Sequence, residues 1–187
     1  AMSLVVDTTT PELRKLVAAL KDKSSLNKVM ANAGRIVIQD HFATYAQTNR
    51  NRFGRPSTFW KRMRQATYAE SDSTVAAVVM PREVAQRRFG GTIKPTGGRK
   101  YLTIPLDRSA YNKSARTFQD LFVLPLKRGG TERRFLAMKV RKNRIKVLYA
   151  LRESVTQTGS ADVLPSDAKI VDAVREAAVE YIARRTP

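Results

Sequence analysis

Apolar residues recur at helical spacing in two segments near the start of the chain. Thr10, Pro11 and Glu12 are typical of a helix start, because a hydroxyl can cap the first turn and proline needs no amide donor there. The pattern stops at residues 21–25 and resumes as a second stripe, which predicts a long helix over about residues 25–46. This helix is apolar on so much of its circumference that we expect it to contact a sheet and another helix or subunit.

The middle of the chain alternates between loops and short elements. Residues 48–56 have no apolar period and are rich in Asn, Arg and Gly, which predicts a basic loop, and a short helix over about residues 58–68 follows it. Residues 73–80 favour a strand that Pro81 ends, and residues 84–89 form a helical turn that ends at a pair of glycines.

Strand patterns dominate the second half. We expect strands at residues 101–104, 121–126, 135–140 and 145–151, the last two joined as a hairpin by a short polar turn. The long polar stretch 107–119, between the first two of these strands, predicts a mobile loop. A helix over about residues 166–184, capped by Ser166, closes the chain. The order indicates an α+β fold in which an antiparallel sheet packs against a long N-terminal helix and a C-terminal helix.

Length and inventory limit the protein class. The chain has 187 residues, of which 42% are apolar, and this suits a single domain over residues 4–187, with residues 1–3 looking like a remnant of tag cleavage. It has no cysteine, which excludes disulfides and cysteine-ligated metals. No segment approaches the roughly 20 apolar residues of a membrane span, so we expect a soluble protein.

Charge is the strongest compositional signal. Lys and Arg number 35 against 16 Asp and Glu, a formal net charge of +19 that indicates an anionic partner: nucleic acid, an acidic protein surface or a membrane surface. The cations lie inside segments that are predicted to fold rather than in a basic tail.

The residues that would support catalysis are scarce. His41 is the single histidine and has no cysteine or second histidine to share a metal, so we interpret it as a structural residue at the edge of the core. The glycines at 90, 91, 97 and 98 lack the spacing of a phosphate-binding loop, which favours turns. Acidic residues are scattered rather than convergent. We therefore expect no enzyme activity and no cofactor.

Cations and aromatic residues occur together at residues 52–55 and 59–62. Such a mixture can hold a nucleic-acid strand by phosphate contacts and base stacking. It can also supply anchors at a core or a subunit interface, which we favour because no recognised nucleic-acid module accompanies it. Trp60 is accordingly a candidate core or interface anchor.

One stretch has a familiar order of motifs. A short helix ends in Phe89-Gly90-Gly91, a basic segment with Ile93 and Pro95 follows, and a strand with Leu102, Ile104 and Pro105 comes next. This order resembles the phage virion-morphogenesis and tail-completion family, which includes minor tail protein Z-like and head-tail joining proteins. The likeness covers about residues 10–182, and it departs from the family pattern at residues 156–161.

The resemblance implies a subunit that joins or terminates a phage tail, from an active phage or a prophage, without catalytic turnover. It implies a ring-forming homo-oligomer that binds other tail or connector proteins, in the virion and in the host cytoplasm during assembly. DNA would pass nearby. The candidate DNA-facing or interface cations are Arg50, Arg52 and Arg55 in the loop and Lys139, Arg141, Lys142 and Arg144 at the hairpin tip. The alternative is a sequence-nonspecific nucleic-acid-binding protein, and a nuclease is more remote.

Overall fold

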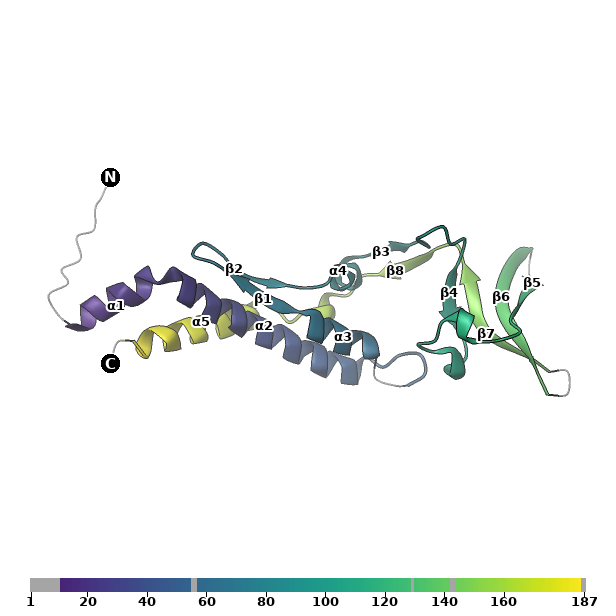
Figure 1. Ribbon diagram of the computed structural model, residues 1–187, viewed down its shortest axis with the longest axis horizontal. Coiled ribbons are helices and arrows are strands. Elements are labelled where there is room, and N and C mark those ends of the chain that lie inside the picture. Colours follow the sequence, from purple (N-terminus) through teal and green to yellow (C-terminus); the bar gives the residue numbers. More distant parts are fainter. Residues whose placement is uncertain (1–10, 55–56, 129, 142–143, 186–187) are drawn as a thin grey trace. The chain divides into compact units, whose positions relative to one another are not determined.

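The computed structural model describes residues 11–54, 57–128, 130–141 and 144–185. Figure 1 shows the order of the elements along the chain. Within the span that the sequence predicts as one domain, the chain forms two compact units. One contains the chain up to Phe89 and from Gly159 onward, and the other is Gly90–Thr158. The expected tag remnant at residues 1–3 lies outside the described residues.

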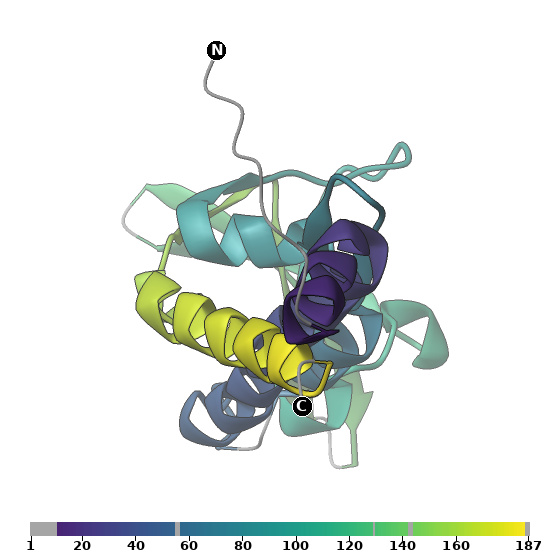
Figure 2. The same ribbon diagram turned by 90° about the vertical axis from the view of Figure 1, so that its left-hand side faces the viewer.

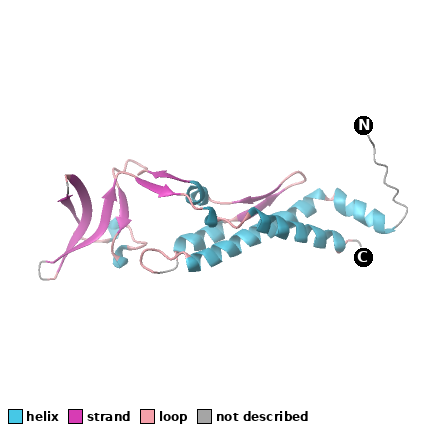
Figure 3. Cartoon of the chain, turned by 180° about the vertical axis from the view of Figure 1, so that it is seen from behind, coloured by secondary structure: helices cyan, strands magenta, loops and turns pink. Residues whose placement is uncertain are grey.

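The first unit is mainly helical, as the colouring in Figure 3 shows. Its elements are α1 (Pro11–Lys21), α2 (Lys23–Thr48), α3 (Thr58–Ala66), β1 (Tyr68–Ser71), β2 (Ala76–Val79), α4 (Arg82–Phe89) and α5 (Asp167–Ala183). The predicted interruption after Lys21 is confirmed: Asp22 separates α1 from α2, and its carboxylate accepts the amide of Ser25 at 3.1 Å. Ser166 caps α5 as expected, accepting the amide of Lys169.

Helix α2 is the centre of this unit. It packs against α3, α5 and the antiparallel hairpin β1–β2, and Figures 1 and 2 show α5 running alongside it. This confirms the expectation that a widely apolar helix contacts both a sheet and another helix. The core of the unit contains six buried residues, Ile38, Phe42, Trp60, Met63, Val84 and Val163.

The second unit is built of antiparallel strands. A four-stranded sheet has the order β4-β7-β6-β5 and contains β4 (Leu102–Pro105), β5 (Phe122–Arg128), β6 (Thr131–Val140) and β7 (Arg144–Arg152). A separate pair joins β3 (Gly90–Ile93) to β8 (Val155–Thr158). The hairpin β6–β7 is confirmed, and residues 142–143 of its turn lie outside the described residues. The α+β class with antiparallel sheets is therefore confirmed, as are the long N-terminal and the C-terminal helix.

The four-stranded sheet contains a β-bulge, and its two faces differ. Leu136 lies opposite Tyr149 and Ala137 opposite Val147, so Leu148 is an extra residue in β7. Leu148 and Tyr149 are both buried, in a cluster with Ala110. We call this the covered face, because residues 106–118 pack on it, and we call the other side the open face.

The stretch 107–119 forms two short 3₁₀ helices, Arg108–Ala110 and Ala115–Thr117, rather than an irregular loop. The carboxylate of Asp107 caps the first by accepting the amide of Ser109 at 2.8 Å. The hydroxyl of Tyr149 donates to the carbonyl of Lys113 at 2.9 Å, which holds the segment on the sheet. The mobility of this stretch stays a prediction. Its backbone does not extend away from the sheet, because the carbonyl of Lys113 is hydrogen-bonded to Tyr149 of β7.

Three of the strands, β1, β3 and β8, were not predicted. β1 occupies the end of the segment expected as helix 58–68, and β8 lies where we expected no strand. Gly90 and Gly91 were expected only to end a helix, and they also begin β3, paired with Thr158 and Gln157. Their φ angles of 78° and 131° are accessible to glycine but strained for other residues, which allows the chain to pass from helix to strand without a loop.

Candidate functional site

The predicted basic loop places its cations in water. Arg50 and Arg52 are exposed, and Arg50 donates to the carbonyl of Gly54 at 3.3 Å, a contact that shapes the loop itself. The guanidinium of Arg52 lies 5.5 Å from the centre of the Phe53 ring. Arg55 lies outside the described residues. In its described part, the loop therefore presents two exposed cations.

The hairpin tip presents cations on both faces of the sheet. Lys139, Arg141 and Arg144 are exposed, and Lys142 lies outside the described residues. Lys139 pairs with Ile145, whereas Arg144 pairs with Val140 at the neighbouring position, so the two cations point to opposite sides. The structure thus brings the predicted residues to one tip but not onto one face.

The family-motif residues span two sheets. Phe89 ends α4 with 81% of its surface exposed, and Ile93 in β3 pairs with Val155. Leu102, Ile104 and Pro105 all lie in β4, which pairs with β7. Pro95 is half-buried in the connection between the two strands. The motif therefore encodes a helix end and the first strand of each of the two sheets in the second unit.

Trp60 lies in the core of the first unit with 6% of its surface exposed. Its ring centre is 4.9 Å from that of Tyr45 and 4.8 Å from that of Phe59, both edge to face, and 5.4 Å from that of Phe42. Of the two roles considered for Trp60, this packing corresponds to the core.

His41 lies at the edge of the same core. Its Nε2 is 2.8 Å from the carbonyl of Asp162, and its ring stacks on Tyr45 at 5.7 Å between centres. This contact joins α2 to the chain just before α5, which agrees with a structural role. Within the described ranges, no three His, Asp or Glu side chains gather as a metal site would require.

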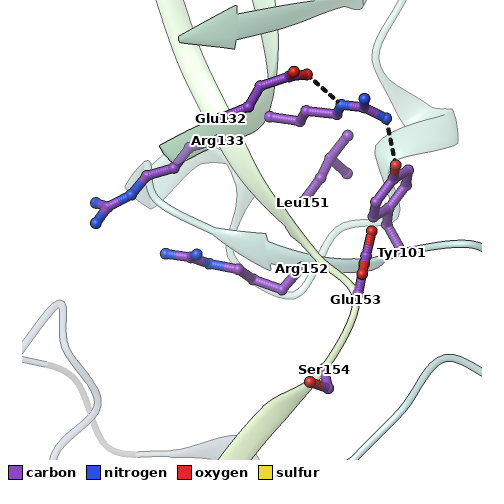
Figure 4. Close-up of a pocket in the computed structure, with 8 residues that line it drawn as sticks. Tyr101, Glu132, Arg133, Leu151, Arg152, Glu153 and Ser154 are labelled. Atoms are coloured by element: carbon purple, nitrogen blue, oxygen red, sulfur yellow. Dashed lines mark hydrogen bonds and ion pairs between the residues drawn. The ribbon is translucent and has the colours of Figure 1, made fainter. Parts of the chain in front are cut away.

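The sequence did not point to a cavity in the second unit at the end of β6 and β7. It has a volume of about 440 Å³ and is lined by Tyr101, Glu132, Arg133, Arg134, Leu151, Arg152, Glu153 and Ser154. Figure 4 shows how these side chains surround it. We take this cavity as the candidate site because it brings the most ionisable groups together in the described part of the second unit.

Arg134 is held firmly on one side of this cavity. Its guanidinium donates to Glu132 at 2.8 Å and to the hydroxyl of Tyr101, the two contacts that Figure 4 marks with dashed lines. The hydrogen bond with Glu132 is the main reason that the pKa of Arg134 lies above its ordinary value. Arg134 therefore stays charged, and two of its five N–H donors are used within the protein.

Arg133 and Arg152 have a different environment. Both are exposed, and neither forms an ion pair with any residue that the structure describes. In Figure 4 their side chains extend to the same side of the cavity. The sequence could not predict that these two side chains lie on the same side, because the residues belong to different strands and are brought together only by the register of the hairpin.

The described residues of the first unit line smaller cavities, among them one of about 300 Å³ beside Trp60 and one of about 210 Å³ between α2 and α5. The first is lined mainly by the apolar edge of α2 and the start of α3, and the second by Val29, Tyr181 and three charged residues of α5 and the residues after it. Neither places a nucleophile beside a base. No helix in the described ranges has the length and apolar composition needed to cross a membrane.

Comparison with protein-family models, with curated proteins and with solved structures gave no match to this chain.

Proposed function

We propose that the protein is a structural subunit of a phage or prophage particle that acts in tail completion or head-tail joining. The open face of the four-stranded sheet supports this proposal most directly. The strand register places these larger apolar residues on the open face: Leu102, Ile104, Phe122, Leu124, Leu126, Phe135, Ile145 and Val147.

None of these large side chains is buried. Leu126 is 47% exposed and Ile145 51% exposed, the others are half-buried, and only the small Ala137 and Ala150 are fully enclosed on this face. Apolar surface that stays in contact with water costs free energy, and contiguous patches of it mark surfaces that become covered by another protein. A sheet face that is complete only after association suits a subunit of a larger assembly.

The net charge favours other virion components over a like-charged copy as the first partner. At +19, two isolated chains repel each other, and a ring forms only where contacts or an anionic template offset that repulsion. The phage assignment itself rests on the resemblance of the Phe89 to Pro105 stretch.

The experiment is deletion of the gene from the genome that encodes it, followed by electron microscopy of the particles. We expect heads and tails that fail to join, or tails that end abnormally. A strain in which only the open face is altered, by Leu126→Glu with Ile145→Glu, should show the same defect. Val123→Glu is the matched control, because Val123 is 54% exposed on the same strand but on the covered face.

Particles of normal shape and infectivity after deletion would contradict the proposal. If Val123→Glu caused a defect equal to that of the open-face variant, the proposed role in assembly would stand, but the open face would not be the surface responsible for it. Circular dichroism of each purified variant checks that the chain still folds.

The second candidate is a sequence-nonspecific nucleic-acid-binding protein, which the exposed cations favour. Its test is titration with duplex DNA at two salt concentrations. Tight binding with a steep salt dependence supports it, and no binding near physiological ionic strength excludes it.

A further inference from the structure

Two arginines lie at the end of the β6–β7 ladder. The register ends with the pair Arg134 and Leu151, and Arg133 and Arg152 are the next residue of each strand beyond that pair. Arg133 pairs with Leu126, and Arg152 pairs with Leu102. A row therefore crosses all four strands on the open face, with two guanidinium groups in the middle and a leucine at each end.

Like charges at directly opposed positions destabilise a sheet. A carboxylate on the same face would relieve the repulsion, but the described strand positions on the open face include no acidic residue. Glu132 belongs to the covered face, where it binds Arg134. Glu153 also lines the cavity, but no described carboxylate forms an ion pair with Arg133 or Arg152. The chain thus keeps a local repulsion that no described ion pair relieves, and such conflicts are expected at functional sites.

The chemistry of the pair favours a tetrahedral oxyanion. A guanidinium offers a planar fork of donors that matches phosphate, and two forks on one face can bind different oxygens of one group. The cavity beside the pair adds the hydroxyl of Ser154. The leucines at the ends of the row offer no competing hydrogen bonds.

We propose that Arg133 and Arg152 form a phosphate-binding site for the backbone of a nucleic acid. A polymer fits better than a small phosphate compound because cations continue beyond the pair. Lys139 lies on the same open face of β6, and Arg141 is exposed just beyond the end of that strand, whereas Lys127 and Arg144 belong to the covered face. The site uses backbone phosphates alone, so it binds without regard to base sequence.

This inference goes beyond the assembly role and is tested on the isolated full-length chain. The probe is a fluorescently labelled DNA oligonucleotide, single-stranded in one arm and duplex in the other, titrated at low and near-physiological salt. Replacement of both residues, Arg133→Gln with Arg152→Gln, should weaken binding about tenfold or more, because each lost contact is a charge-assisted hydrogen bond. The slope of log affinity against log salt should become shallower by about 1.

The matched control is Arg108→Gln with Arg116→Gln. These residues are exposed in the same unit, on the segment that packs on the covered face, so the variant removes the same net charge from elsewhere. We expect it to weaken binding by less than about threefold, through the general field alone. Arg133→Lys with Arg152→Lys keeps the charge but not the fork, and should fall between the wild type and the glutamine variant.

Three results would overturn the site. The first is equal weakening by the two glutamine variants, which would show that only net charge matters. The second is absence of wild-type binding near physiological salt. The third is competition by inorganic phosphate or polyglutamate as effective as by unlabelled oligonucleotide at equal charge, which would indicate a small anion or an acidic protein instead. Because assembly is read from particles and this site from DNA binding, either proposal can fail alone.

Discussion

The hydroxyl of Tyr149 donates a hydrogen bond to the backbone carbonyl of Lys113 across 2.9 Å. It also lies 3.3 Å from the carbonyl of Ala110, and its ring meets Phe118 edge to face. One buried side chain of β7 thereby fastens a stretch of chain that has no strand partner of its own. The stretch covers the part of this face around Leu148 and Tyr149, which are both buried, whereas Val123 near the edge of the same face stays 54% exposed.

Tyr149→Phe should loosen this stretch and leave the sheet intact. The ring still packs, but the carbonyls lose their donor, at a cost of about 1 kcal/mol for a buried hydrogen bond. Hydrogen exchange should show faster exchange at residues 108–118 than in the wild type, with β6 and β7 unchanged. Tyr68→Phe, at a tyrosine that is 54% exposed, is the control and should alter neither. Equal protection in Tyr149→Phe would contradict this role of the hydroxyl.

The same tyrosine predicts sensitivity to alkali. Burial raises the pKa of Tyr149 above its ordinary value of 10.0, because the ionised phenolate loses solvation in the core. The folded state therefore keeps the proton more strongly than the unfolded state. The stability that this difference contributes is fully present below pH 10 and is lost as the pH rises above it. Above pH 10, the melting temperature of the wild type should therefore fall more steeply with pH than that of Tyr149→Phe.

Asp107 predicts the opposite sensitivity, to acid. Hydrogen bonds from the side chain and the amide of Ser109, with Lys146 at 3.0 Å, lower the pKa of Asp107 from 3.8 to about 2. The stability that this gives is present above pH 3.8 and is lost as the pH falls through about 2. An NMR titration should place the midpoint of this carboxyl near 2. Asp107→Asn should remove this part of the acid dependence, and a midpoint at the ordinary value would contradict the cap.

Much of the fold could be predicted because its signals are local. The start of α1 at Pro11, the break at Asp22 and the cap at Ser166 each depend on side chains a few residues apart. β1 and β8 could not be predicted in this way. Tyr68–Ser71 has no strong strand pattern and becomes a strand because β2 pairs with it and α2 packs on it. Val155–Thr158 likewise depends on β3, more than sixty positions earlier.

The candidate site shows the same limit. The sequence indicated which cations lie at the hairpin tip, since a turn is a local feature. It could not indicate that Arg133 and Arg152 share a face, because this needs the exact register of β6 and β7, including the bulge at Leu148. Trp60 could be placed at a core or an interface by its type, and only packing against Phe42, Tyr45 and Phe59 distinguishes the two.

Trp60→Ala should therefore reduce the stability of the first unit strongly. Removing a large side chain from a packed core typically costs about 3–5 kcal/mol, and little nearby can fill the space left among three aromatic rings. Urea unfolding followed by helical circular dichroism should show the loss. Trp60→Phe keeps part of the contact area and should cost less. If Trp60→Ala instead altered only association with partners, the residue would act at an interface.

Gly34 controls how closely α2 approaches its neighbours. A Cβ at this buried position would lie 3.2 Å from Cγ2 of Val78 in β2 and 3.7 Å from Cγ2 of Val174 in α5. Alanine there gains about 1 kcal/mol of helix propensity, offset by a tight contact with a single valine methyl, so we expect a small net change. Leucine cannot be accommodated without moving an element, and Gly34→Leu should destabilise the unit by about 1–3 kcal/mol.

Urea unfolding of the two Gly34 variants measures this directly. Lys28→Leu is the control, because it places the same side chain at an exposed position of the same helix and should leave the free energy of unfolding nearly unchanged. Equal free energies of unfolding for Gly34→Leu and Lys28→Leu would contradict the close packing of the β1–β2 hairpin and α5 against α2 at Gly34. A loss confined to Gly34→Leu would show that the absence of a side chain at one position allows α2 to contact the hairpin and α5 together.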